Sequence, residues 1–458
     1  AEKGGLKLQC FVGDTYIPIE GIKATLVSSH GSGGESKEVE LTTNSSGESQ
    51  VIELSAPLLE YSQNPTGNIP YSLYDLRIER QGFQSLVVNG IQIFPDEIAI
   101  QQCNLVEESR RVGNRADVIN IQPNTLNGNY PSKIPEEVDK PLPPPTSGVV
   151  LPKPVVPEFI TVHAGGPNNT TAPNYTVPYK DYIKNVASCE IYSTWPESTI
   201  RANVYAIISF TLNRIYTEWY RGKGKNFDIT NSTAYDHAFN YGRNLYESIS
   251  VIVDDIFSTY IRRFGRKQPL LTQYCDGKNV QCPGWMTQWG SKYLGDEGKS
   301  PYEILTSFYG SDIELVTAEV VEGSPSSYPG YDLTVGSSGD EVQTIQEQLN
   351  RIAQNYPLIP KLAVDGVYGY KTKEAVTVFQ GVFNLPQTGV VDYATWYKIS
   401  DVYVGVTKIA ELRSSCKQKI FIPPVSFDII NSNEIPRFNY FRPCRCCPKR
   451  QQVGCHGL

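Results

Sequence analysis

Residue types that bind nucleic acid or enter a membrane are scarce in this sequence. Charged residues make up 19% of its 458 residues, the net charge is −7 and no basic block occurs, which argues against a nucleic-acid partner. The longest apolar run within a helical stretch, VYAIISF, is far shorter than the roughly 20 residues of a membrane-spanning helix. Methionine occurs once, at Met286, and the chain starts at Ala1, so we expect that an initiator methionine or an export signal has been removed.

The sequence is long and rich in tyrosine. A chain of 458 residues is too long for one ordinary domain, and about two to four are expected. There are 29 tyrosines against 16 phenylalanines. Tyrosine offers a flat apolar ring with a polar tip, which suits a carbohydrate surface as well as a β-rich core.

The ten cysteines are unevenly spread. Cys275 and Cys282 bracket the short loop CDGKNVQC, which favours a disulfide formed in an oxidising compartment. The tail CRCCPKRQQVGCH holds four more beside His456 and could bind zinc, although Cys-x-Cys-Cys is not a standard ligand spacing. Unstructured thiols, intermolecular cross-links and removal as a second pro-segment are the alternatives for this tail, which belongs to a C-terminal segment at 401–458.

The first third of the chain reads as strands followed by a linker. Residues 1–103 alternate apolar and polar positions between Gly, Asn, Pro and Ser turns, which predicts a small antiparallel β-sandwich. Their order resembles carboxypeptidase-regulatory-like or prealbumin-like sandwiches. Residues 104–158 include PLPPPTSGVVLPKPVVPEF, typical of an extended linker exposed to proteases.

Residues 159–322 read as a second, helix-containing domain. Pro178 followed by Tyr179, Tyr182, Ile183 and Val186 predicts a helix through VPYKDYIKNVASCE. The stretch TWPE predicts a capping box that opens a second helix, with Thr194 as N-cap and Glu197 three residues later. That helix buries a broad apolar face and runs to about Trp219, and a third is expected across residues 242–264.

Glu190 stands at the end of the first of these helices. A carboxylate at the negative end of a helix dipole ionises less readily, and burial by Ile191, Tyr192 and Trp195 would raise its pKa further. A carboxyl group that stays protonated near neutral pH is what a general acid needs to cleave a glycosidic bond. Most glutamates at helix ends are solvated and inert, so local sequence alone does not decide between the two readings.

Three blocks of this domain resemble the SpoIID/LytB family. YIKNVASCEIYSTWPESTIRANVYAIISF resembles its opening helix, glutamate and long second helix. FDITNSTAYDHAF resembles its Asp-x-Thr-x-x-Thr stretch, and MTQWGSKYLGDEGKSPYEILTSFYGSDIELV its Met-Ser-Gln-x-Gly segment and closing helix. The resemblance implies a mixed α/β domain in which Glu190 is the catalytic glutamate.

Residues 333–400 resemble the small three-helix peptidoglycan-binding domain over its whole length. VGSSGDEVQTIQEQLN matches its opening, and AVDGVYGYKTKEAVTVFQGVFNLPQTGVVDYATW matches the remainder. Many of the matching positions are turns and core residues, so the resemblance implies binding by the domain as a whole. The predicted fold class is therefore multidomain α+β, with a β-sandwich, a mixed α/β domain and a three-helix domain.

This order of domains resembles spore cortex-lytic enzymes of the SleC type. The resemblance implies a lytic transglycosylase that cleaves the MurNAc–GlcNAc bond of cortex peptidoglycan, made as a zymogen that a germination protease activates by cutting in 104–158. It places the protein in the spore cortex or coat region, outside the inner membrane, and requires no cofactor and no metal. One carboxylate suffices, because the C6 hydroxyl closes on C1 as a 1,6-anhydro ring and no water attacks.

Candidate substrate-binding residues follow from aromatic character and from the family motifs. Hydrogen bonding to sugar hydroxyls or N-acetyl groups is our hypothesis for the polar ones, and the aromatic ones are equally expected in the core. The set is Tyr192, Trp195, Thr230, Tyr235, Asp236, Thr287, Gln288 and Trp289. Two departures from the family matter: Ile208 replaces a common Arg of the long helix, and the second block has only His237 and no Cys, which predicts no zinc there.

Two further classes of function fit parts of the sequence. A non-catalytic, wall-binding enhancer of an amidase is favoured by the missing Arg, while Glu190 in an aromatic setting favours an enzyme. A structural coat or cortex component fits the cysteine-rich tail but leaves the Glu190 motif unexplained. Release of anhydro-sugars or reducing ends from cortex separates the enzyme from both.

Overall fold

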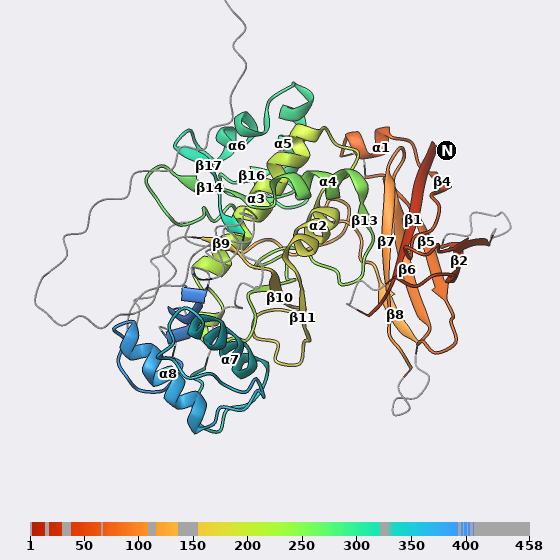
Figure 1. Ribbon diagram of the computed structural model, residues 1–458. Coiled ribbons are helices and arrows are strands. Elements are labelled where there is room, and N and C mark those ends of the chain that lie inside the picture. The colour runs from red at the N-terminus through yellow and green to blue at the C-terminus, as the bar shows by residue number, and fades with distance from the viewer. Residues whose placement is uncertain are drawn as a thin grey trace, which may run out of the picture. The chain divides into compact units, whose positions relative to one another are not determined.

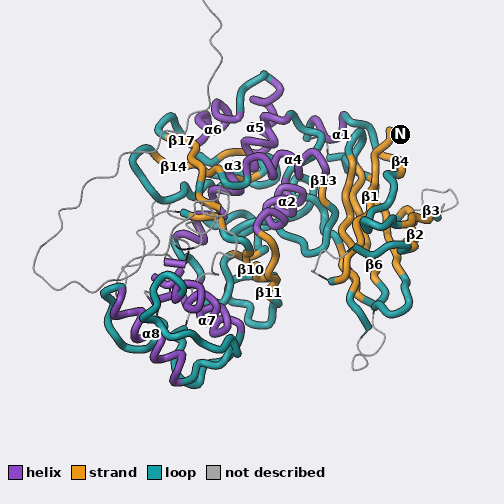
Figure 2. Tube along the Cα trace, viewed as in Figure 1, coloured by secondary structure: helices purple, strands orange, loops and turns teal. Residues whose placement is uncertain are grey.

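The structure is a computed structural model of the whole chain (Figure 1). It describes residues 2–13, 18–29, 38–65, 67–108, 116–135, 154–320, 329, 331–392, 395–396, 398–400, 402–403 and 406. Strands dominate up to residue 120 and helices afterwards (Figure 2), so the mixed α+β class is confirmed. The cysteine-rich tail at 444–455 lies outside the described residues.

Two sheets form the N-terminal sandwich. The first has the order β13-β7-β1-β4, with bounds β1 Glu2–Val12, β4 Ile52–Ala56, β7 Ile98–Leu105 and β13 Leu245–Tyr246. The second has the order β3-β2-β5-β6-β8, with bounds β2 Lys23–Ser28, β3 Val39–Thr42, β5 Ser72–Ile78, β6 Leu86–Ile93 and β8 Asp117–Asn120. A short helix, α1 (Glu60–Gln63), follows β4. Alternate residues of β1, such as Leu6, Leu8 and Cys10, are buried, as the period of two predicts.

The sandwich differs from the prediction in being partly parallel. β1 pairs in parallel with β7, and β6 pairs in parallel with β8. The connections of these pairs are long, so they need no hairpin turn, and alternation along a strand carries no information about the direction of its neighbour.

Residues 116–135 also differ from an extended linker. They begin with β8, which completes the second sheet, and continue as an ordered segment hydrogen-bonded to the central domain. The Pro-rich part, 136–153, lies outside the described residues, and so does the predicted cleavage region within it.

The sandwich is joined to the central domain rather than separated from it. β13 belongs to the central domain by sequence, yet it pairs antiparallel with β7. The indole of Trp195 donates to the carbonyl of Ser62 at 2.9 Å, and buried side chains of both domains form one continuous hydrophobic core. Sequence periodicity does not detect a shared core of this kind, because each contact joins residues far apart in the chain.

The central domain is built around two consecutive helices. α2 spans Tyr179–Glu190 and α3 spans Glu197–Tyr216, as the periodicity predicts, with Ile200, Val204, Ile207, Ile208 and Leu212 all buried. The remaining helices are η1 (Arg221–Lys223), α4 (Glu247–Ile256), α5 (Gln288–Asp296) and α6 (Pro301–Tyr309). The short strands are β9 (Val155–Val156), β10 (Phe159–His163), β11 (Asn174–Pro178), β12 (Ile229–Thr230), β14 (Thr259–Arg263), β15 (Tyr274–Cys275), β16 (Met286–Thr287), β17 (Ile313–Thr317) and β18 (Glu319–Val320).

Two details predicted for these helices are wrong. The capping box is absent, because Pro196 occupies the N-cap, while the Thr194 hydroxyl donates to Ser62 Oγ at 2.7 Å and Glu197 pairs with Arg201. The helix expected over 242–264 is shorter, since β13 pairs with the sandwich before α4 and β14 pairs with β17 after it.

The C-terminal described part has its own hydrophobic core, formed with α7 (Asp340–Ala353) and α8 (Tyr370–Val382). Two buried glutamines hold equivalent turns. Gln346 Nε2 donates to Asp365 Oδ1 at 2.8 Å and to the Val367 carbonyl at 3.0 Å. Gln380 Nε2 donates in the same manner to the Val390 carbonyl at 2.9 Å. These glutamines are therefore residues that define the fold.

Candidate active site

Glu190 is the last residue of α2, and its side chain is 3% exposed. The helix ends there because Ile191 adopts an extended conformation and the Asn124 side chain takes over the free carbonyls. Asn124 Nδ2 lies 3.4 Å from the Ser188 oxygen and 3.1 Å from the Ile191 oxygen. A residue of the segment 116–135 therefore caps the helix that presents Glu190.

Two donors contact the Glu190 carboxylate. The backbone N–H of Ala238 donates to Oε1 at 2.6 Å, and the hydroxyl of Tyr274 donates to Oε2. Burial raises the pKa of Glu190 above its usual value. The positive charge of Lys133, and then the two hydrogen bonds, act against that rise. This is the direction expected for a carboxyl group taken out of water.

Lys133 is distant from Tyr274 in the sequence, but in the structure its ammonium group lies over the tyrosine ring. The Nζ atom is buried, 4.4 Å from the ring centroid of Tyr274 and 5.2 Å from that of Phe210. A desolvated cation over aromatic rings is held by their quadrupoles. It also supplies positive charge close to Glu190.

A small cavity of about 50 Å³ adjoins Glu190. It has room for a few water molecules but not for a sugar ring. Its lining comes from four parts of the chain: Thr125, Tyr130, Pro131, Lys133, Glu190, Thr233, Tyr274, Cys275, Asp276, Val280 and Gln288.

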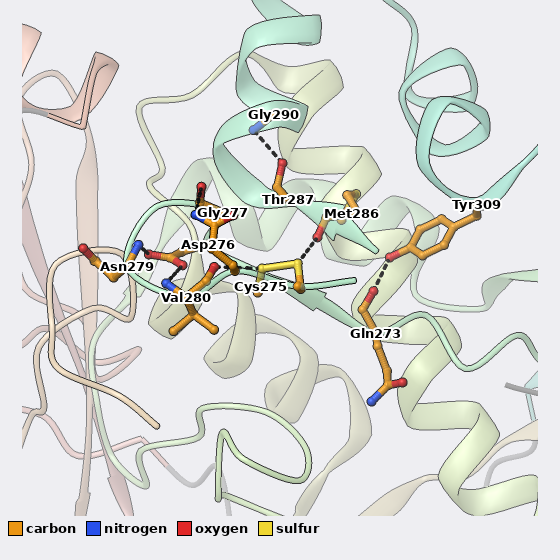
Figure 3. The surroundings of a disulfide bond; sticks show 12 residues. Gln273, Cys275, Asp276, Gly277, Asn279, Val280, Met286, Thr287, Gly290 and Tyr309 are labelled. Carbon is orange, nitrogen blue, oxygen red and sulfur yellow. Dashed lines mark hydrogen bonds between the residues drawn. A yellow bond between two sulfur atoms is a disulfide. The ribbon is translucent and has the colours of Figure 1, made fainter. Parts of the chain in front are cut away.

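A disulfide fixes the loop that carries Tyr274. Cys275 and Cys282 are bonded, as the sequence predicts (Figure 3). Within the loop, Asp276 accepts hydrogen bonds from the backbone of Asn279 at 2.8 Å and of Val280 at 2.7 Å. The paired strands β15 and β16 then connect Tyr274 to α5. Tyr274 is therefore held from both sides next to Glu190.

Of the predicted substrate-binding residues, Gln288 lies next to Glu190. Its Nε2 donates to the Glu190 carbonyl at 3.0 Å, and its side chain lines the cavity. Thr287 is the N-cap of α5 and accepts from the Gly290 N–H at 3.2 Å. These two residues position the ends of two helices.

The predicted aromatic residues form an interior cluster. Tyr192 and Trp195 are 2% and 4% exposed, and Trp289 is half-buried against both. Tyr192 also packs on Phe94 of the sandwich, at 5.3 Å between ring centroids. They fill the boundary between the sandwich and the central domain.

Asp236 and Thr230 belong to a separate buried network. Asp236 Oδ1 accepts from Arg214 Nε at 2.7 Å. Its Oδ2 accepts from the Tyr220 hydroxyl at 2.7 Å and from Thr230 N and Oγ1 at 2.9 and 2.7 Å. Tyr235 contributes its carbonyl to the same guanidinium, at 3.1 Å from Arg214 Nη2. This network ties α3 to the loop that supplies the Ala238 N–H.

Three groups at the site escape prediction from the sequence: Tyr274, Lys133 and the Ala238 N–H. The proximity of Tyr274 to Cys275 was the available signal, since a disulfide marks a loop held in place. No sequence signal identifies Lys133, because it lies in the stretch 104–158 that the sequence predicts to be a linker. His237, next to Ala238, is buried and shares a hydrogen bond of 3.0 Å between Nδ1 and the Tyr182 hydroxyl. Burial holds the pKa of His237 well below its usual range.

The comparisons with known proteins bear on the C-terminal part. Residues 338–399 match the family described as putative peptidoglycan binding domain. No curated protein matches the chain. A minor pilin of Streptococcus agalactiae is similar at 18% identity over 25% of this chain, with a TM-score of 0.17, which carries no argument. The match spans about half (49%) of the pilin's length.

The family match confirms the predicted peptidoglycan-binding domain and links the protein to the cell wall. The SpoIID/LytB resemblance of 159–322 stays a prediction. Within the part of the chain that the structure describes, no helix has the length and apolarity to span a bilayer. Among the same residues, no group of three or more His, Cys, Asp and Glu side chains is arranged to hold a metal ion.

Proposed function

We propose that this protein is a lytic transglycosylase that cleaves the MurNAc–GlcNAc bond of peptidoglycan, with Glu190 as its catalytic acid and base. The observation that carries the proposal is a buried carboxyl group of raised pKa at the edge of a cavity, in a chain with a peptidoglycan-binding domain. Burial favours the protonated form, which is the form a general acid must hold before the bond breaks.

The chemistry needs one carboxyl group in two roles. Glu190 protonates the glycosidic oxygen as the bond to C1 breaks, and the carboxylate then removes the proton of the C6 hydroxyl. The C6 oxygen bonds to C1, so a 1,6-anhydro ring forms and Glu190 is protonated again. Tyr274 and the Ala238 N–H stabilise the carboxylate between these two steps, when its charge is greatest.

The setting of this activity is the spore cortex at germination, with a protease cutting in 104–158 to release the enzyme from a zymogen. The resemblance in domain order to cortex-lytic enzymes supports this part. The disulfide at the site supports a compartment outside the cytoplasm.

A hydrolase is the second candidate, because Asp276 lines the same cavity as Glu190. A hydrolase needs a second carboxylate to activate water or to attack C1. Both oxygens of Asp276 accept backbone N–H groups of their own loop, which favours a structural role for this residue. The product separates the two reactions, since hydrolysis adds water and ring closure does not.

Digestion of purified cortex peptidoglycan by the linker-cleaved protein tests the proposal, with the products identified by mass spectrometry. We expect anhydro-muropeptides from the parent and none from Glu190→Gln, which keeps the shape but cannot donate the proton. Asp276→Asn serves as the comparison and should still give anhydro products. Products that incorporate oxygen from labelled water would point to a hydrolase, and absence of products with intact binding would point to the amidase enhancer.

A further inference from the structure

Residues 122–134, which we call the arm, lie across Glu190. The arm follows β8 of the sandwich and leads directly into the Pro-rich stretch where the sequence predicts proteolysis. Four of its residues, Thr125, Tyr130, Pro131 and Lys133, line the cavity beside the Glu190 carboxylate.

The start of the arm is bound to the end of α2. The Thr125 N–H donates to the Cys189 carbonyl at 2.9 Å, and the Thr125 hydroxyl lies 3.4 Å from the Glu190 carbonyl oxygen. Leu126 is buried at 4% exposure, so this part of the arm is anchored by an apolar side chain as well.

The end of the arm is bound to the loops that build the site. The Ile134 N–H donates to the Ala234 carbonyl at 2.7 Å, and Gln273 Nε2 donates to the Ile134 carbonyl at 3.1 Å. Ala234 lies four residues before Ala238 and Gln273 directly precedes Tyr274, so the arm is bound to the two loops that supply the donors to Glu190. Lys133, between them, inserts its ammonium group over the Tyr274 ring.

We infer that the arm is an inhibitory segment that occupies the glycan-binding groove of Glu190, with the Ala234 carbonyl and the Gln273 amide as groove contacts that the glycan takes over. This inference rests on the proposed function and names the regulation of the same site. With the arm in place the cavity of about 50 Å³ admits water but no sugar ring, so the substrate cannot reach the carboxyl group. The charge of Lys133 also favours the carboxylate form of Glu190, which is the wrong form for the first step.

The end of the arm is more easily released than its start. Pro131, Ser132 and Ile134 are exposed, whereas Leu126 belongs to the buried core that the sandwich shares with the central domain. A cut in 136–153 frees the C-terminal end of the arm and leaves the sandwich in place. The two cleavage products are therefore expected to co-elute in size-exclusion chromatography while the arm exchanges out of the groove.

The test is carried out on the uncut full-length chain. Lys133→Ala/Ile134→Pro removes the inserted ammonium and the N–H donated to Ala234, and Ser132→Ala is the matched control at an exposed neighbour. A soluble peptidoglycan tetrasaccharide is the probe, and hydrogen exchange of peptides covering 229–241 and 270–277 reports binding. Because both peptides lie outside residues 338–399, tetrasaccharide bound by the peptidoglycan-binding domain does not contribute to this signal.

We expect the loosened arm to exchange faster and the tetrasaccharide to protect both peptides with at least about tenfold higher affinity than in the parent. Ser132→Ala should behave as the parent. Lys133→Ala alone, checked for an unchanged melting temperature, covers the case in which the double variant does not fold, and should shift affinity in the same direction.

Two results would overturn the inference. Suppose that the folded variants bind the tetrasaccharide as the parent does, while the linker-cleaved parent digests peptidoglycan. The arm would then not be inhibitory, and the proposed catalytic activity would still hold. If linker-cleaved Lys133→Ala loses activity while its arm stays protected from hydrogen exchange, the arm is a permanent part of the active site and not an inhibitor. If the variant with the loosened arm binds the tetrasaccharide but no form of the protein digests peptidoglycan, the inference that the arm blocks the groove is supported and the proposed catalytic function is refuted.

Discussion

Two of the carboxylates buried in the central domain, Asp236 and Glu190, lie in surroundings of opposite kinds. Asp236 accepts from a guanidinium, a phenol, a hydroxyl and a backbone N–H, so its charge is balanced within the network. Glu190 has two donors, a lysine above a neighbouring ring, and a cavity at its side. Similar burial therefore accompanies a structural ion pair in one place and, in our proposal, a reactive group in the other.

The difference shows that burial alone does not identify a catalytic acid. A carboxylate whose hydrogen-bonding capacity is filled by fixed partners contributes to the fold and has no remaining role in proton transfer. A carboxylate with fewer partners and access to a cavity retains the ability to exchange a proton. The same criterion assigns Gln346 and Gln380 of the peptidoglycan-binding domain to the fold.

The largest expected effect comes from breaking the Asp236 network. Arg214→Met leaves a buried carboxylate without its cation and should lower the free energy of unfolding by about 3–5 kcal/mol. Urea denaturation followed by circular dichroism measures this change. Lys23→Met, which breaks the exposed pair between Lys23 and Glu40, is the control and should show almost no change. A small cost for Arg214→Met would remove the distinction between the two carboxylates.

A third carboxyl group, Glu97, tests whether the boundary between sandwich and central domain responds to pH. Its Oε2 accepts from Ser248 Oγ of α4 at 2.6 Å. Burial, opposed by the Ser248 hydrogen bond and aided by the charges of Asp96 and Glu247, raises its pKa from 4.5 to about 7.

Since the folded state binds this proton more tightly than the unfolded state, Glu97 stabilises the protein fully below about pH 4.5 and loses that contribution as pH rises through about 7. The loss is at most about 3 kcal/mol. Denaturation at a series of pH values should show this fall, and Glu97→Gln should flatten it. The exposed Glu53→Gln is the control, and an unchanged slope in Glu97→Gln would refute the assignment.

The disulfide tests the surroundings of Glu190, because it fixes the loop that carries Tyr274, one of the two hydrogen-bond donors to this carboxylate. Replacing Cys275 and Cys282 by Ser should lower the free energy of unfolding by about 2 kcal/mol, as expected for a short closed loop. Activity should fall further than stability explains, since Tyr274 precedes Cys275 directly. Rates and melting temperatures measured with and without reductant check this, and reductant should have no effect on the double-Ser variant. Full activity without the disulfide would show that the loop needs no covalent tether.

Local features of the sequence predict much of this site, and contacts distant in the chain account for what it misses. The boundaries of α2, the placement of Glu190 at its end and the disulfide all follow from residues within one or two helical turns. Tyr274 and Lys133 reach Glu190 from 84 and 57 positions away, in stretches that read as loop and linker. Tyr192 and Trp195 follow Glu190 closely in the sequence, but both pack against the sandwich, and no periodicity reports which domain lies against a helix.

The most direct test of the account is a paired measurement on Glu190→Gln and Asp236→Asn, each for unfolding free energy and, after linker cleavage, for the rate of release of peptidoglycan fragments. The account predicts that Glu190→Gln changes stability by less than about 1 kcal/mol and lowers the rate by roughly 10²–10⁴-fold. It predicts that Asp236→Asn costs about 3–5 kcal/mol, because Arg214 is left buried without its partner. Full activity of Glu190→Gln, or lost activity with unchanged stability in Asp236→Asn, would contradict it.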